Sequence, residues 1–333
     1  WEISRTTNAA KAASVEVPVL ATDAYHRALE VIDGGNATVW RRYQQAVSAA
    51  CTQSLLEWRD EEITEFKTKA DLIAKALSGV ECFEPYIATI LAAGESDKDG
   101  YSNQLGWIDQ MVNQPGWEGS GIQFHTAFPK LITFVAQALV GAMLVEKGRM
   151  EDVHGLLTTP VGRRGYGEEL PLFVNIRING WPDSITECTT AWRLLDQTVE
   201  KWTWVAEAFG GKRQARVAIS AYYLAMNLLC FVKCSKHGKL SEDEMRLQMP
   251  LCFCAWRDGI PDDGLKLLLK KRGFLADLLK ENGITAAKLK MDWALWRDMN
   301  SKWLGNVYRG FGMEVAFPHG ELPEKLERSP LSI

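Results

Sequence analysis

The chain has 333 residues, 47% of them hydrophobic and 24% charged, a composition typical of globular proteins and unlike that of disordered or membrane proteins. A formal net charge of −4 argues against a uniformly basic surface, although a local basic groove is compatible with that total. No apolar run reaches the roughly 18 residues that a membrane-spanning helix needs. The nearest run, Leu131–Val145, is interrupted by Thr133 and Gln137, so no membrane association is predicted.

The seven cysteines have no regular spacing, and no signal peptide precedes them. Both features are typical of reduced thiols, and they predict a cytoplasmic protein. The chain begins at Trp1 without an initiator Met. Either the true N-terminus is missing or the chain is a segment of a longer protein, in which case a catalytic domain could precede Trp1.

The first half of the chain predicts a series of helices after a polar arm or linker at residues 1–20. Capping residues and glycine stops mark their ends. The expected helices are one that Thr22 caps and Gly34-Gly35 ends, one from an Asn36 or Thr38 cap through Trp58, one from Asp60 to a stop at Gly79, one over 85–93 and one over 104–112. Along the second of these, the spacing predicts a buried face of Val39, Tyr43, Ala46, Val47, Ala50 and Leu55.

Residues 126–157 predict a nearly all-apolar helix, a Lys-Gly-Arg turn and a short second helix. Apolar side chains cover every face of Leu131–Val145, so this helix is expected to be buried on all sides at the centre of the domain.

The second half predicts a basic, glycine-rich connecting loop at 159–183 and then further helices. Residues 171–179 alternate like a strand, but a lone extended segment or a helix start fits equally well. The expected helices are one from an Asp183 or Ser184 cap to Phe209, one from Arg213 to about Ser235, one over 251–257, one over 262–281 and one over 285–308, followed by a tail at 311–333.

Together these elements predict an all-α fold, either an irregular multi-helix bundle or a solenoid-like array of helical hairpins around a buried central helix. The predicted organisation is an N-terminal helical lobe at 21–158 and a C-terminal helical lobe at 184–310, joined by the 159–183 loop.

Two groups of basic residues are candidate phosphate or RNA ligands. Arg163 and Arg164 lie in the loop GRRGYG, where adjacent arginines on a flexible backbone beside an aromatic residue suit single-stranded nucleic acid. Lys212, Arg213 and Arg216 open a helix, at the end where the helix dipole disfavours cations.

Arg149 and His154 are weak catalytic candidates. Their five-residue separation resembles the Arg–His pair of HEPN-type ribonucleases, all-α enzymes whose His acts as general acid or base and whose Arg stabilises the phosphate. Those enzymes favour a polar residue directly after the Arg, where this chain has Met150. The chain has no phosphate-binding glycine loop, zinc-protease motif or nucleophile elbow, and we predict neither a metal nor a cofactor.

The central stretch also resembles the helical region that follows effector domains in some bacterial antiphage defence proteins. That region would follow an NAD-consuming domain or a nuclease, and the resemblance implies a sensing or assembling module whose catalytic partner lies elsewhere. The matching residues are Phe128, Pro129, Leu131, Phe134, Ala136, Leu139, Gly141, Ala142, Gly148, Leu156, Leu157, Pro160 and Val161.

Three functional hypotheses follow. The first is a non-catalytic sensor or assembly module that forms homo-oligomers and binds a protein partner or effector domain. The second is an RNA-binding nucleoprotein that polymerises through residues 1–20 and 311–333 and holds single-stranded RNA on the two basic groups. The third is an all-helical ribonuclease that uses Arg149 and His154.

Overall fold

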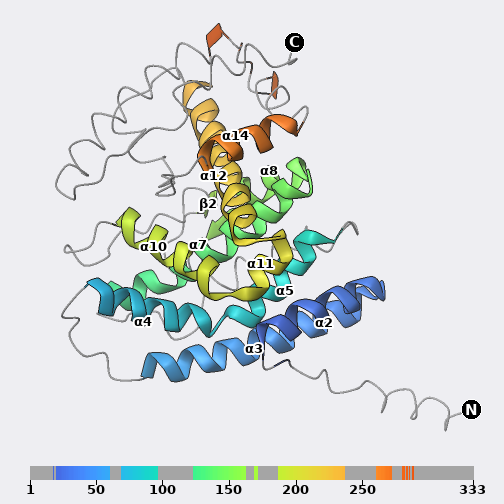
Figure 1. Ribbon diagram of the computed structural model, residues 1–333, viewed down its shortest axis with the longest axis vertical. Coiled ribbons are helices and arrows are strands. Elements are labelled where there is room, and N and C mark those ends of the chain that lie inside the picture. Colours follow the sequence, from blue (N-terminus) through green and yellow to red (C-terminus); the bar gives the residue numbers. More distant parts are fainter. Residues whose placement is uncertain are drawn as a thin grey trace, which may run out of the picture.

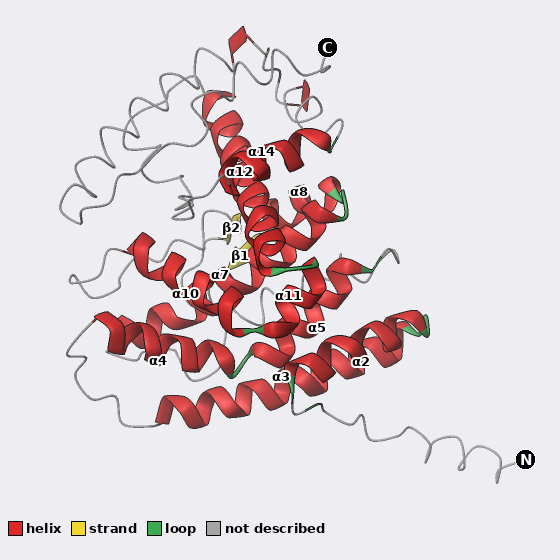
Figure 2. Ribbon diagram, viewed as in Figure 1, coloured by secondary structure: helices red, strands yellow, loops and turns green. Residues whose placement is uncertain are grey.

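A computed structural model describes residues 18, 20–60, 69–96, 123–162, 169–171, 187–236 and 260–271, and isolated positions between 280 and 288. Ten helices make up nearly all of this described part, which confirms the all-α prediction (Figures 1 and 2). They are α2 (Ala21–Asp33), α3 (Ala37–Asp60), α4 (Lys69–Glu81), α5 (Glu84–Glu95), α7 (Gln123–Glu146), α8 (Met150–Thr158), α10 (Glu187–Lys201), α11 (Thr203–Phe209), α12 (Lys212–Lys236) and α14 (Ile260–Lys270).

Helix α7 is the centre of the fold, as its composition predicts. Every residue from Leu131 to Val145 is buried, and α7 packs against α5, α8 and α12 as well as α4 and α10. The amide of Gln137, which is fully buried, donates to the Tyr223 hydroxyl at 3.2 Å and accepts from the Tyr222 hydroxyl. These bonds pair a polar group that would otherwise destabilise the core.

Helices α2 to α5 form the opposite side of the molecule from α12 and α14 (Figure 1). Asn36 caps α3 by accepting hydrogen bonds from the backbone N–H groups of Thr38 and Val39, which confirms the predicted cap. Several boundaries differ from the prediction. Asp60, expected to begin a helix, is the last residue of α3, and the helix expected over 262–281 ends at Lys270. Thr22 lies inside α2, whose N-cap is Leu20, and α4 continues through Gly79, which is buried, to Glu81.

The predicted buried face of α3 is wrong in part, because Val39 and Ala50 are exposed. The buried hydrophobic residues of α3 recur every three or four positions and place the large aromatic side chains inside. They are Trp40, Tyr43, Val47, Cys51, Leu55 and Trp58. The face is therefore rotated toward the two tryptophans, which bury more apolar area than Val39 and Ala50 would.

The long helix predicted up to Phe209 is two helices, because the chain leaves helical geometry at Trp202 (φ −83°, ψ 96°). Trp202 is buried and stacks on Trp204, with the ring centroids 5.6 Å apart. The Trp204 indole N–H then donates to Glu84 of α5 at 2.8 Å. The break between α10 and α11 therefore lies at two packed tryptophans, and no Gly or Pro marks it.

Helices from both predicted lobes contribute to one hydrophobic cluster. The contact between α7 and α12 depends on Gly141, because a Cβ at that position would overlap the Tyr222 ring. Helix α14 also approaches α12 closely, and a Cβ on Gly264 would lie 2.8 Å from the Ser220 hydroxyl.

The connecting loop contains a short antiparallel ribbon of β1 (Pro160–Gly162) and β2 (Glu169–Pro171). Other predicted segments lie outside the described residues. They are most of the arm at 1–20, the short helix at 104–112, the possible strand after residue 171, the helix at 251–257, most of the helix at 285–308, and the tail at 311–333.

Candidate phosphate-binding cluster at the start of helix α12

The turn between α11 and α12 sets the position of the predicted basic cluster. Gly210 and Gly211 both have positive φ (72° and 143°), a backbone conformation that suits glycine and reverses the chain direction. Helix α12 begins directly afterwards at Lys212, so Lys212, Arg213 and Arg216 lie in its first turns. There the unpaired N–H groups of the helix add to their positive charge, and the cluster needs an anionic partner.

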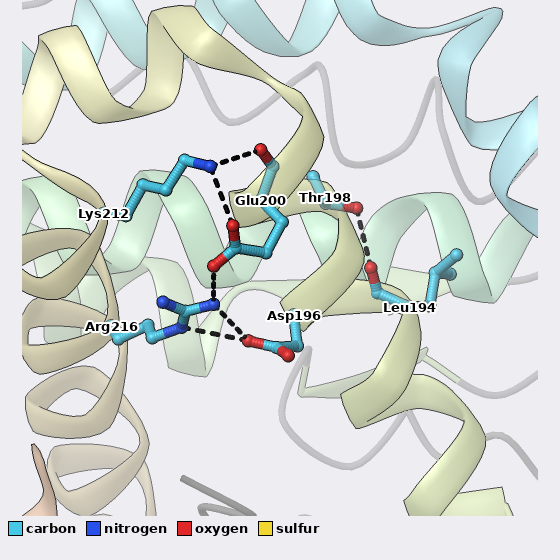
Figure 3. A network of polar contacts seen from close by, with 6 residues as sticks. All are labelled: Leu194, Asp196, Thr198, Glu200, Lys212 and Arg216. Carbon is cyan, nitrogen blue, oxygen red and sulfur yellow. Dashed lines mark hydrogen bonds and ion pairs between the residues drawn. The ribbon is translucent and has the colours of Figure 1, made fainter. Parts of the chain in front are cut away.

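Helix α10 supplies that partner for two of the three cations (Figure 3). The Lys212 Nζ lies 2.7 Å from the Glu200 Oε2 and also donates to the Glu200 backbone carbonyl at 2.8 Å. The Arg216 guanidinium donates to Asp196 Oδ1 through Nε at 2.9 Å and through Nη2 at 2.8 Å, and it pairs with Glu200 as well. Its side chain is only 17% exposed, so the pair with α10 is partly shielded from water.

Helix α14 supplies the partner of the third cation. Arg213 Nη2 lies 2.6 Å from Asp263 Oδ2, and Lys266 reaches the other oxygen of the same carboxylate at 3.0 Å. The three predicted phosphate ligands all lie in the first turns of α12, and each contacts a carboxylate.

The carboxylates respond electrostatically to these neighbours. Hydrogen bonds from Lys212 and Arg216 lower the pKa of Glu200, and hydrogen bonds from Arg213 and Lys266 lower the pKa of Asp263. Both acids are therefore ionised at neutral pH. An incoming phosphate would have to displace them.

Arg163 and Arg164 lie outside the described residues, as do all residues from 163 to 168. The strands on either side of them are described, and Gly162 pairs with Glu169 in the ribbon. The six residues that hold the two arginines therefore connect paired strands.

Arg149, the first of the two catalytic candidates, has structural partners at the end of α5 and on α8. Arg149 is the N-cap of α8, where its guanidinium donates to the Ser96 carbonyl at 2.6 Å and pairs with Asp152 at 2.7 Å. His154 lies within α8 and is half-buried. The arginine holds α8 against the end of α5.

Sequence reasoning missed the acidic partners Asp196, Glu200 and Asp263. One local signal exists, since Asp196 and Glu200 are four residues apart and share a helix face. It also missed that basic side chains satisfy carbonyls at helix C-terminal ends. Lys271 donates to the Glu146 carbonyl of α7 at 2.7 Å, in the same way that Arg149 reaches Ser96 after α5 and Lys212 reaches Glu200 in α10.

Other ionisable residues also join helices. Glu95 of α5 accepts from the Tyr25 hydroxyl of α2 and pairs with Lys147 at 3.1 Å. Burial raises the pKa of Glu84, and the hydrogen bond from the Trp204 N–H partly offsets this rise.

Within the described residues, no group of three or more His, Cys, Asp or Glu side chains is placed to hold a metal ion. None of the described helices is long and apolar enough to cross a bilayer.

Comparison of the chain with protein-family models, with curated proteins and with solved structures finds no match.

Proposed function

We propose that this chain is a non-catalytic helical sensor or assembly module that acts through self-association and through contacts with a protein partner or effector domain in the cytoplasm. The proposal extends the resemblance of the central stretch to the helical region of bacterial antiphage defence proteins. In this role the helices provide a rigid body, and the chemistry belongs to another domain or protein.

The observation that carries the proposal is the use of the cations around α12. Lys212, Arg213 and Arg216 each pair with a carboxylate on α10 or α14, so they tie three helices together. Arg149, the weak catalytic candidate, likewise joins α8 to α5. Side chains that would serve an RNA-binding or nuclease site have structural partners, which favours a scaffold.

A second candidate function is RNA binding, as in an all-helical nucleoprotein. The β1–β2 ribbon favours it, because the paired strands flank the segment that carries Arg163 and Arg164. In that case Lys212, Arg213 and Arg216 would exchange their carboxylate partners for RNA phosphates.

Size-exclusion chromatography with light scattering distinguishes the assembly module from the nucleoprotein. The protein is purified without nuclease, and the 260/280 nm absorbance ratio is recorded. The proposal predicts a nucleic-acid-free oligomer whose mass is unchanged by ribonuclease. A high ratio, with large assemblies that collapse on ribonuclease treatment, would replace it with the nucleoprotein function. In that case, the double variant Arg163→Ala with Arg164→Ala is expected to lower the salt slope of RNA binding by about 2.

A further inference from the structure

Helix α3 differs from the other two long helices of the described part in leaving a whole side open. Helix α7 is buried over Leu131–Val145, and α12 is buried over Ala218–Met226. Helix α3 contacts α5, α2 and α4 on one side and lies along the edge of the molecule (Figure 1).

The open side forms a continuous stripe, here called the outer stripe, that runs most of the length of the 24-residue helix. Its members recur every three or four residues, directly opposite the buried aromatic face, and all are exposed. They are Thr38, Arg42, Gln45, Ala49 and Gln53.

Charged residues lie near both ends of α3, with Arg41 and Arg42 near its start and Glu57, Arg59 and Asp60 in its last turn. Arg41 and Arg42, near the start of α3, are exposed and form no ion pair with any described side chain. The other arginines whose side chains are described do pair with a carboxylate: they are Arg27, Arg149, Arg213 and Arg216. At the other end, exposed Glu57 accepts a hydrogen bond from Gln53 of its own helix at 3.0 Å.

We propose that the outer stripe binds the same stripe of a second copy, with the two α3 helices antiparallel about a two-fold axis near Ala49. Since a helix rises about 1.5 Å per residue, this register places Gln45 level with Gln53 of the second copy. It also places Arg42 within about 1.5 Å, along the axis, of Glu57 of the second copy. Arg42 and Glu57 lie about 60° apart around the helix, on the same flank of the stripe, so each faces the other in an antiparallel pair.

Two-fold symmetry makes the interaction occur twice, because the same patch is used on both copies. A partner of uniform charge would attract only one of Arg42 and Glu57, whereas a second antiparallel copy brings Glu57 to Arg42 and Arg42 to Glu57. The small side chain of Ala49 at the axis lets the two helices approach closely. This inference rests on the proposed function, since it names the surface through which the assembly module self-associates.

A contact between single helices falls at the small end of protein interfaces, so the dimer is weak and exchanges rapidly. Its attraction comes largely from exposed charges, so it weakens as salt is added.

Charge reversal tests the pairing. In Arg42→Glu the new acid faces Glu57, and in Glu57→Arg the new base faces Arg42, so neither variant pairs with itself. When the two variants are mixed, each interface regains two opposite-charge contacts. Sedimentation velocity over a concentration series is expected to show that each variant alone self-associates about tenfold or more weakly than the original chain, and that the equimolar mixture recovers dimerisation. Lys270→Glu, an exposed charge reversal on α14, is the matched control and should dimerise like the original chain.

Recovery in the mixture cannot arise from a folding defect, and circular dichroism of each variant checks the fold separately. If the original chain self-associates and both reversals leave that unchanged, the α3 interface is wrong while the assembly function stands. The same conclusion follows if the variants are monomeric and their mixture stays monomeric. If the original chain is a monomer at the highest concentration, both the interface and the assembly function are overturned.

Discussion

Helix α7 and the first turns of α12 are both central to the fold, yet different forces hold them. Helix α7 is held by apolar contacts on every side, and its buried amide at Gln137 is satisfied by two tyrosines. The start of α12 is held by charges, through Arg216 to α10 and Arg213 to α14. The difference teaches that apolar pattern predicts where a helix is buried, whereas the role of a charged residue depends on which acids the tertiary fold brings to it.

Leu139→Asp tests the burial of α7 and has the largest expected effect. Leu139 is fully buried in α7, and an unpaired buried charge costs several kcal/mol, enough to exceed the stability of many domains. We expect no soluble folded protein, assayed by soluble expression and circular dichroism. The control Leu139→Met keeps the volume and should remain folded. Soluble, folded Leu139→Asp protein would contradict the buried position of α7.

A smaller change tests the contact between α7 and α12. Gly141→Ala places a methyl group against the Tyr222 ring, so we expect a loss of about 1–3 kcal/mol in the free energy of unfolding, measured with urea. Gly155→Ala is the matched control, since a Cβ there meets no atom within 4 Å. It should leave stability unchanged or raise it by up to about 1 kcal/mol through helix propensity. Equal effects of the two substitutions would show that α12 does not approach Gly141 closely.

The sequence predicts the burial of α7 and several helix ends, but it predicts the buried face of α3 only in part. Burial of Leu131–Val145, the Asn36 cap and the glycine turn before Lys212 all follow from local patterns. The break at Trp202 does not, because no Gly or Pro marks it; Trp202 is buried there and stacks on Trp204.

The candidate site could be predicted only as a group of cations. Clustering of Lys212, Arg213 and Arg216 follows from their spacing on one helix, but their partners are distant in the chain, up to 50 residues away for Arg213 and Asp263. Whether such a cluster is free for phosphate depends on those partners, which pattern alone does not indicate.

Arg216→Ala tests whether ion pairs hold the start of α12 to α10. It leaves the carboxylates of Asp196 and Glu200 close together without the guanidinium, and we expect a loss of about 1 kcal/mol. Arg27→Ala is the control, because the Arg27–Glu30 pair is well exposed and lies within one helix, where such pairs contribute little. The measurement is the urea midpoint at constant slope. A midpoint unchanged by Arg216→Ala would mean that the pairs do not hold α10 to α12.

The smallest effect is a pair of pH dependences with opposite signs. The pKa of Glu200 is lowered, so its contribution is present above the unfolded value of about 4.3 and is lost as pH falls through the folded pKa. The pKa of Glu84 is raised by burial, so its contribution is present below about pH 4.3 and is lost as pH rises through the folded pKa.

Thermal unfolding of Glu200→Gln and Glu84→Gln measures both pH dependences. The range from about pH 3 to about pH 7 spans the pKa of an unfolded Glu side chain. Glu200→Gln is expected to be less stable than the original chain at neutral pH, by less than about 1 kcal/mol because the group is exposed, and equal to it in acid. Glu84→Gln should gain on the original chain as pH rises. The same pH trend in both variants would contradict the assignment of a salt-bridged acid on α10 and a desolvated acid on α5.

The central claim is that Lys212, Arg213 and Arg216 hold helices together rather than holding phosphate. Urea unfolding with and without excess oligouridylate tests it most directly, on the original chain and on the triple variant Lys212→Gln, Arg213→Gln, Arg216→Gln. A ligand that binds the folded protein raises its unfolding midpoint. The account predicts that the triple variant unfolds at lower urea and that RNA shifts neither midpoint. The account is contradicted if the triple variant and the original chain unfold at the same urea concentration without RNA, and RNA raises the midpoint of the original chain alone.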